Sequence, residues 1–444
     1  MKNPSFFQVG VIGVFIFFIL IAVLIFSGIL PGFRNDSSSG GTVSMWGSIP
    51  SAVFKAALQN EPALSNANIT VTYTEIPASS FETTLIDALA RSGGPDLIIM
   101  PHTLIYRHAD KVRLTSNESL SARDYADSFI EEGKLFQRAN GAIAFPLYVD
   151  PLVMYVNRDI YSTAGYPRTP EFWDQFFSAG SGRSVLSTLT AIDSRGMIEK
   201  SAIALGDFSN VNHAKDIISL FLLQAGSAIV APNATADAGY VSDLTSNENE
   251  KTTLPAVLAV NFFTQFADRG RTTYTWSGSL QKSKDAFTSG MLASYIGLAS
   301  ELPELKAKNP HLNFDMTLIP QRTEGTALTF GNIYGVAVLA RAQNPNVALR
   351  AAGIITGKNF SGALAKTLSV ASARRDALDT QSSDPLRTVI DRSALIARGW
   401  LDPNPVATET VFGTMVQSTI VGRSETTSAV NRAHQELNIL LNKK

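Results

Sequence analysis

The amino-acid sequence predicts an α/β fold that follows one N-terminal transmembrane helix. Residues 6–30 form a run of 25 residues without a charged side chain, and about 20 apolar residues are enough to cross a bilayer as a helix. From residue 42 onward, short β-branched stretches alternate with segments of helical periodicity. Such alternation is typical of a sheet that is covered by helices on both faces.

The apolar run indicates a membrane anchor over residues 1–34. A cleavable signal peptide has an apolar region of only about 7 to 15 residues, so the greater length here favours a retained helix. Lys2 on one side, against Arg34 and Asp36 on the other, gives a weak positive-inside bias. We therefore expect a single-pass protein of the cell membrane with an extracytoplasmic domain, joined by a flexible linker at residues 35–41.

Composition excludes several classes of function. The 37 Lys and Arg residues nearly balance the 38 Asp and Glu residues, so no net positive field attracts nucleic acid. The absence of cysteine excludes disulfides, thiolate metal sites and a thiol nucleophile. The spacing of His102 and His108 is not specific for a metal, and the sequence holds no phosphate-binding loop or nucleophile elbow. We expect no metal, no cofactor and no catalysis.

The first part of the soluble region has a β-α-β-α-β rhythm. Period-two alternation with β-branched residues predicts the strands, and apolar residues at helical spacing predict the helices. Ser79 and Glu82 match a helix capping box, and the glycines and proline at residues 93–95 end that helix. The predicted elements are a strand at 42–46, a helix over 53–58, a strand at 69–76, a helix after Ser79 and a buried strand at 96–100.

The second part continues the mixed pattern. Two strands are predicted to flank the residues 148–151, and a helix is predicted to begin at Pro170, a residue type that is favoured at the first helical position. The predicted strands are 142–147, 152–156, 292–297, 314–319 and 333–339, and the further helices are about 211–225 and 254–268. No internal repeat occurs in the chain.

Six short motifs then occur in the order and spacing of one known family. They are Val43–Gly47 (VSMWG), Ala88–Asp96 (ALARSGGPD), Phe145–Ile160 (FPLYVDPLVMYVNRDI), Pro170–Phe176 (PEFWDQF), Ala286–Ala293 (AFTSGMLA) and Phe330–Gly335 (FGNIYG). In this set the chain resembles the family-1 extracellular solute-binding proteins, which include maltose- and other sugar-binding receptors of ABC importers. Each motif alone is weak, but the ordered set is specific and spans about residues 42–440.

The resemblance implies a two-lobed fold of the periplasmic-binding-protein type II, with a ligand cleft at the crossing strands and hinge closure on binding. It places lobe one at residues 42–146 plus 336–388, and lobe two at residues 147–335 plus 389–444. It also implies a small solute, expected to be a carbohydrate, and delivery to the permease of an ABC importer. The sequence departs from the family in lacking a lipoprotein cysteine, so the apolar helix is expected to anchor the chain.

A sugar site needs aromatic faces and a few polar groups in a cleft. Trp46 ends the first strand, where open α/β sheets bind ligands, although a Trp there could equally fill the core. Asp150 could accept two sugar hydroxyls or merely cap a turn beside Pro151. Trp276 and Trp400 lie in polar loops, where an indole is awkward to bury without a purpose. The expected ligand-binding residues are Trp46, Tyr148, Asp150, Trp276, Tyr295, Asn332, Tyr334 and Trp400.

Two alternatives from other classes stay open at this stage. A carbohydrate-active hydrolase needs two carboxylates on either side of the scissile bond, and sequence alone does not give their separation. A sensor or adhesion module with the same fold is the other alternative. No cytoplasmic output domain precedes the helix in this sequence, which disfavours a sensor.

Overall fold

The computed structural model describes residues 40–91, 93–178, 182–233, 239–246 and 253–442. The predicted membrane anchor at 1–34 and most of the predicted linker lie outside the described residues. Within the described ranges, every helix is too short or too polar to cross a membrane.

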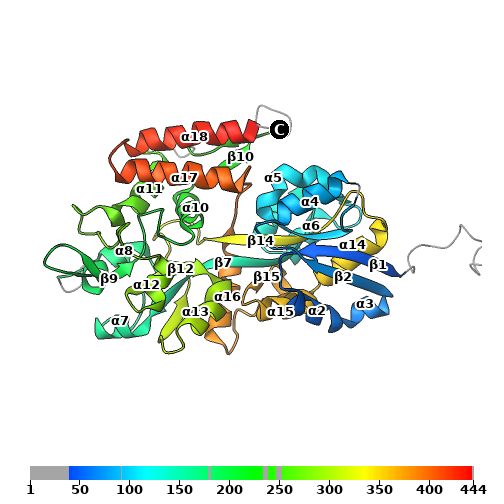
Figure 1. Cartoon of the computed structure of the whole chain (residues 1–444), viewed down its shortest axis with the longest axis horizontal. Helices are drawn as coiled ribbons and strands as arrows, with labels where there is room; N and C mark the ends of the chain where they lie inside the picture. The colour runs from blue at the N-terminus through cyan, green and yellow to red at the C-terminus, as the bar shows by residue number, and fades with distance from the viewer. Residues whose placement is uncertain (1–39, 92, 179–181, 234–238, 247–252, 443–444) are drawn as a thin grey trace, which may run out of the picture.

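A single mixed sheet runs through both lobes of the molecule (Figure 1). Its strand order is β2-β1-β3-β14-β7-β12-β9-β8, with β13 and β15 pairing to β7 and β16 pairing to β14. The strands are β1 (Gly41–Gly47), β2 (Ile69–Glu75), β3 (Leu97–Pro101), β7 (Phe145–Asn157), β8 (Ala191–Ile192), β9 (Ile198–Ile203), β12 (Leu292–Leu298), β13 (Phe314–Thr317), β14 (Thr329–Val338), β15 (Ala371–Ser372) and β16 (Ala397–Arg398). Smaller sheets pair β10 (Val230–Pro232) with β11 (Tyr240–Ser242), and β6 (Gly141–Ala142) with β4 (Thr115–Ser116) and β5 (Gln137–Arg138).

The lobe that contains β1 is built on three parallel strands. β1 lies between β2 and β3, and the predicted strands at 42–46, 69–76 and 96–100 are confirmed. Asp96 joins two of them, because its carboxylate accepts hydrogen bonds from the Ser44 amide and hydroxyl, each at 2.8 Å. The helices of this lobe are α2 (Ser51–Gln59), α3 (Pro62–Asn66), α4 (Phe81–Ala90), α5 (Ile105–His108), α6 (Ala122–Ser128), α14 (Pro345–Ile355) and α15 (Lys358–Thr367).

The other lobe carries strands β8, β9, β12 and β13 and most of the remaining helices. In Figure 1 the long helices α17 and α18 lie side by side over α10 and α11. Leu220 and Phe263, on α10 and α11, are fully buried, which explains why these two apolar helices form here. The helices are α7 (Arg158–Thr163), α8 (Trp173–Phe177), α9 (Val185–Leu189), α10 (Ala214–Ala225), α11 (Pro255–Thr264), α12 (Ser283–Thr288), α13 (Leu302–Lys308), α16 (Pro385–Leu395), α17 (Pro405–Ile420) and α18 (Thr426–Asn442).

Two long strands connect the lobes, and the structure corrects the sequence prediction for one of them. β7 is one continuous, fully buried strand of 13 residues, where the sequence predicted two strands separated by residues 148–151. Pro151 is the last residue of β7 that pairs with β14, and Leu152 is the first that pairs with β12. Proline lacks an N–H for the ladder. The strand tolerates Pro151 because its pairing partner changes there.

Two helix starts also differ from the prediction. Helix α4 begins one residue later than a capping box at Ser79 requires, because the N-cap is Ser80 and its side chain caps no backbone amide. Helix α8 begins at Trp173 and not at Pro170. Glu171 and Phe172 stay outside the helix because this segment pairs with Gln321, whose backbone bonds Glu171 and Trp173, both at 2.9 Å. Tertiary pairing thus overrides a local helix signal.

A buried carboxyl group lies beneath the crossing strands. Glu132, in the 3₁₀ helix at Glu131–Phe136, is 2% exposed, and neither of its carboxyl oxygens has a hydrogen-bond partner. Glycines make room for it: a Cβ at Gly399 would lie 2.8 Å from Oε1, and a Cβ at Gly331 would lie 3.1 Å from Oε2. Burial raises the pKa of Glu132 well above its usual range, and the charge of Arg398 opposes this only in part.

Replacing Glu132 with Gln is expected to remove a pH dependence of stability. Because the folded-state pKa is raised, the native chain holds a proton that the unfolded chain releases, so stability falls as pH rises above about 4.3. Near pH 8, Glu132→Gln should raise the free energy of unfolding by about 1 kcal/mol, within the usual cost of an unsatisfied buried group. Urea unfolding at pH 5 and pH 8 measures this. Equal pH slopes for both proteins would contradict the account.

Candidate ligand-binding site at the crossing strands

Four polar or aromatic side chains share one face of the two crossing strands. Asp150 pairs with Asn332 and Tyr148 pairs with Tyr334 in the antiparallel ladder between β7 and β14. Residues two apart on a strand, and their direct cross-strand partners, point to the same side of a sheet. The rings of Tyr148 and Tyr334 are stacked, with centroids 4.6 Å apart and an interplanar angle of 16°. The sequence-predicted group Tyr148, Asp150, Asn332 and Tyr334 is therefore brought together.

The start of α10 adds two titratable side chains to this face. Asn332 hydrogen-bonds the Asp216 carboxylate, which places the first turn of α10 beside β14. His213 precedes the helix in a left-handed conformation with φ of 57°. Its Nε2 lies 3.2 Å from Glu301 Oε1, so the ring reaches across to the segment that follows β12.

Glu301 is the most heavily hydrogen-bonded carboxylate of the group. Besides the ion pair with His213, it accepts a hydrogen bond from the Tyr295 hydroxyl at 2.8 Å and forms an ion pair with Lys284 at 3.0 Å. Burial disfavours its charge, but the interaction with His213 outweighs burial and lowers the pKa of Glu301 to about 2. The pKa of His213 is raised, because the interaction with Glu301 outweighs the burial of its ring. The pair is a charged one.

Asp150 has a pKa that is shifted in the opposite direction to that of Glu301. Its side chain is 7% exposed, and its Oδ1 accepts a hydrogen bond of 3.0 Å from the Ser300 amide. Burial raises the pKa of Asp150 to about 6, although the bond to Ser300 and the charge of His213 pull it down. A desolvated carboxylate with free acceptor capacity is suited to hydroxyl or ammonium donors of a ligand.

The first turn of α10 also contributes a second ion pair. Lys215 Nζ is 2.5 Å from Asp402 and 3.0 Å from the carbonyl of Pro405, and it lies over the Trp400 ring at 5.7 Å. Trp400 itself is 3% exposed and donates its indole N–H to Ser219 at 3.2 Å. The Trp400 ring thus contacts Lys215 and is almost completely buried, so little of the ring is left to contact a ligand.

His102 is the side chain that the lobe of β1, β2 and β3 contributes next to the α10 side chains. It follows β3 in the 3₁₀ helix His102–Leu104 and is 1% exposed. Burial lowers its pKa to about 4, with a further lowering by the charge of Lys215, while a hydrogen bond to the Ile333 backbone acts the other way. His102 is therefore neutral at physiological pH. The neighbouring His108 is engaged elsewhere, 2.6 Å from Glu82.

The other sequence-predicted residues lie in different surroundings. Tyr295 is fully buried and reaches the group only through its hydrogen bond to Glu301. Trp46 is half-buried and packs against core residues at the end of β1. Trp276 is 1% exposed and donates its indole N–H to Asn210 at 2.7 Å. Its loop is polar in sequence yet packed in the core, so it adds no surface at the crossing strands.

The sequence did not predict the side chains that α10 and the segment after β12 bring to the crossing strands. His213, Asp216, Ser300 and Glu301 were not among the expected residues. A signal for the first two exists, since a His-x-x-Asp sequence opens the apolar helix α10. Ser300 and Glu301 lie in the 3₁₀ turn just after the buried strand β12, and the carboxyl ends of buried strands are where ligands bind in open α/β sheets.

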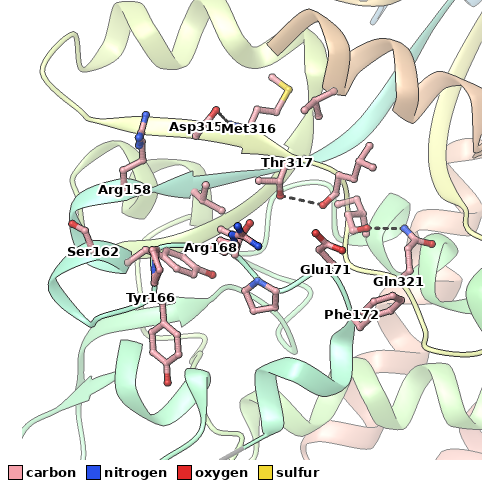
Figure 2. Close-up of a pocket in the computed structure, with 18 of the residues that line it drawn as sticks. Arg158, Ser162, Tyr166, Arg168, Glu171, Phe172, Asp315, Met316, Thr317 and Gln321 are labelled. Carbon is pink, nitrogen blue, oxygen red and sulfur yellow. Dashed lines mark hydrogen bonds between the residues drawn. The ribbon is translucent and has the colours of Figure 1, made fainter. Parts of the chain in front are cut away.

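A cavity of about 1060 Å³ lies away from this group (Figure 2). Figure 2 shows Arg158, Arg168 and Glu171 around it. Its walls come from residues 156–172 and 313–321 and from α16. Strands β1, β2 and β3 contribute nothing to the walls, so a ligand there would not contact both lobes. The crossing strands are the better candidate because His102 and the α10 side chains approach from different lobes.

Comparison with known proteins gives the family. Residues 50–353 match the family described as bacterial extracellular solute-binding protein. No curated protein is similar enough to be matched.

Solved structures share the fold at low identity. The sugar-binding protein MalE from Xanthomonas citri has 16% identity and a TM-score of 0.72, covering 91% of this chain and 98% of its own. The cyclic α-maltosyl-1,6-maltose binding protein from Arthrobacter globiformis has 16% identity and a TM-score of 0.71, covering 91% and 100%. A cyclo/maltodextrin-binding protein has 14% identity and a TM-score of 0.71, covering 90% and 97%. This chain belongs to the bacterial extracellular solute-binding proteins.

Proposed function

We propose that this chain is a membrane-anchored, extracytoplasmic receptor that captures a carbohydrate between its lobes and delivers it to an ABC importer. The observation that carries the proposal is the shared face of Tyr148, Asp150, Asn332 and Tyr334 on the two strands that connect the lobes. The lobes are proposed to divide as residues 42–146 plus 336–388 and residues 147–335 plus 389–444.

The position of the site supports a closure mechanism. A solute that contacts His102 from one lobe and Asp216 or Ser300 from the other binds the closed arrangement better than the open one. A ligand shifts a conformational equilibrium only by this difference in affinity, and rotation about a few connecting strands is a common hinge movement. The permease then distinguishes the loaded receptor from the empty one by its closed shape.

The chemistry of the site supports a carbohydrate. Sugar hydroxyls are donors and acceptors, and Asp150, Asn332 and Asp216 offer carboxylate and amide groups for them. Tyr334, which is partly exposed, adds an aromatic surface next to these groups. Proteins of the same fold are described with tagatose, maltotetraose and cycloalternan bound. The proposed reaction is binding and release, without turnover.

The anchor rests on the sequence alone. The uncharged run at residues 6–30 is long enough to span a bilayer, and the chain has no cysteine for lipid attachment. A helical anchor would keep the receptor at the membrane that holds its permease. Fractionation of cells that produce the protein should place it with the membranes, and urea or high salt should not release it.

Binding to the full chain in lipid nanodiscs tests the function. We expect at least one mono- or oligosaccharide of a panel to bind with a dissociation constant in the micromolar range or tighter, measured by isothermal titration calorimetry. Product analysis after long incubation should return the ligand unchanged. A panel without any binder would refute the proposed receptor, and cleavage of a bound glycoside would make the protein a hydrolase.

A further inference from the structure

We propose that the solute carries a positive charge next to its hydroxyls, as in an amino sugar or an amine-bearing oligosaccharide. This inference rests on the proposed function, since it concerns the ligand of the same site. It follows from the carboxylates and other hydrogen-bond acceptors at the crossing strands. Some of them have no cation or donor among the described residues.

The site holds more carboxylates than cations. Five carboxylates lie there, and they are Asp150, Asp216, Glu301, Glu304 and Asp402. The cations in contact with them are His213, Lys215 and Lys284. Two negative charges therefore remain uncompensated even when His213 is protonated. The chain as a whole has a formal net charge of only -1, so this excess is local.

The cations already pair with three of these carboxylates. Lys215 is held by Asp402 and the Pro405 carbonyl. Lys284 is shared between Glu301 and Glu304, at 3.0 and 2.9 Å, and the closest approach of His213 is also to Glu301.

Two carboxylates are left with little or no compensation. Among the described residues, Asp150 has no cationic group within ion-pair distance, and Asp216 has only His213 Nδ1 at 3.9 Å. Burial raises the pKa of both groups. Desolvated carboxylates are costly until a cation or several donors reach them.

His102 adds an independent sign that the site lacks a donor. Its ring is 1% exposed, and Nδ1 has no hydrogen-bond partner. Because the ring bonds the Ile333 backbone and is neutral above about pH 4, its second nitrogen is a free acceptor. It comes from the opposite lobe and lies close enough to Lys215 to feel its charge.

An ammonium group satisfies these requirements better than a hydroxyl group. It brings one positive charge and three donors and needs no acceptor, whereas each hydroxyl brings one donor and no charge. Charge-assisted hydrogen bonds are shorter and roughly twice as strong as neutral ones. These unpaired acceptors therefore favour a ligand whose amine reaches Asp150 and Asp216.

Matched ligands on the full chain in nanodiscs test this inference. Glucosamine oligomers, the corresponding N-acetylglucosamine oligomers and cello-oligosaccharides have the same ring geometry and length and differ in charge. We expect the amine series to bind about 100-fold more tightly than either neutral series at pH 6.5, a difference of about 2.7 kcal/mol. The preference should shrink as ionic strength rises, since salt screens the attraction between a charged ligand and the carboxylates of the site.

A charge-neutralising variant locates the effect. Asp216→Asn should lower affinity for the amine series about tenfold and thereby narrow the preference. Asp268→Asn removes one charge from an exposed ion pair with Arg271 and should leave the preference intact. Near-equal affinity of amine and neutral sugars in the unmodified chain would overturn this inference and leave the proposed receptor standing. Absence of binding by every saccharide would overturn both.

Discussion

Replacing Asp150 with Ala is expected to weaken solute binding by about 100-fold or more. The side chain is fixed by the Ser300 amide at 3.0 Å and lies on the strand that joins the lobes. Each hydrogen bond to a charged group contributes about 1.5 to 3 kcal/mol, so the loss of two bonds to a ligand reaches this size. Titration calorimetry with the best ligand of the panel measures it.

The control for this prediction is an Asp→Ala change in the cavity of Figure 2. Asp315 lines the space in Figure 2 and its described side-chain hydrogen bond is to the neighbouring Met316 amide. Asp315→Ala should bind the solute as tightly as the unmodified chain. If Asp315→Ala lost affinity and Asp150→Ala kept it, the solute would occupy the cavity at α7 and β13, and the site at the crossing strands would be excluded.

Replacing Arg387 with Ala is expected to destabilise the fold by about 3 to 5 kcal/mol, the usual effect of leaving a buried charge without its partner. Asp391 is fully buried on α16, and Arg387 is 9% exposed. Arg387 donates hydrogen bonds to the Asp391 carboxylate from Nε, at 2.8 Å, and from Nη2. It also donates a hydrogen bond of 2.6 Å to the Val370 carbonyl. Urea unfolding followed by circular dichroism gives the free energy of unfolding.

The double variant Arg387→Leu with Asp391→Leu serves as the control. It removes both charges together, so no unpaired charge stays buried, and it should recover a large part of the lost stability. The Asp379 amide donates a hydrogen bond of 2.9 Å to Asp391. It loses this acceptor in the double variant, so recovery of stability should be incomplete. A loss below about 1 kcal/mol for Arg387→Ala alone would show that the pair contributes no more than a surface ion pair.

The strands of the fold could be predicted from sequence because each carries a local signal. β-branched alternation marks β2, and short apolar runs mark β3 and β12, so their type and place were confirmed. The misassigned elements depend on contacts between distant residues. β7 stays one strand because its pairing partner changes at Pro151, and α8 starts late because Gln321 pairs with Glu171 and Trp173.

The site could be predicted only where it lies on the connecting strands. Tyr148, Asp150, Asn332 and Tyr334 follow from the ladder, since two crossing strands must place paired residues on one face. Loop residues carry no such constraint. The loop of Trp276 is polar and resembles a surface loop, yet Thr275 and Trp276 are each 1% exposed. Asn210, 66 positions away, satisfies the indole, and no local pattern reveals that partner.

Ligand-driven closure about the crossing strands is the central claim, and a distance measurement tests it most directly. The chain has no cysteine, so two introduced cysteines can be spin-labelled without background. Leu114 and Met197 are exposed, at 42% and 41%, one in each proposed lobe. Leu258, 44% exposed, with Met197 gives a control pair within one lobe.

Pulsed dipolar spectroscopy should show a shift in the distance between labels at positions 114 and 197 on saturation with solute. The control pair should not change, and the shift should be absent in Asp150→Ala at the same solute concentration. A solute that binds by calorimetry but leaves the 114–197 distance distribution unchanged would contradict a site between the lobes.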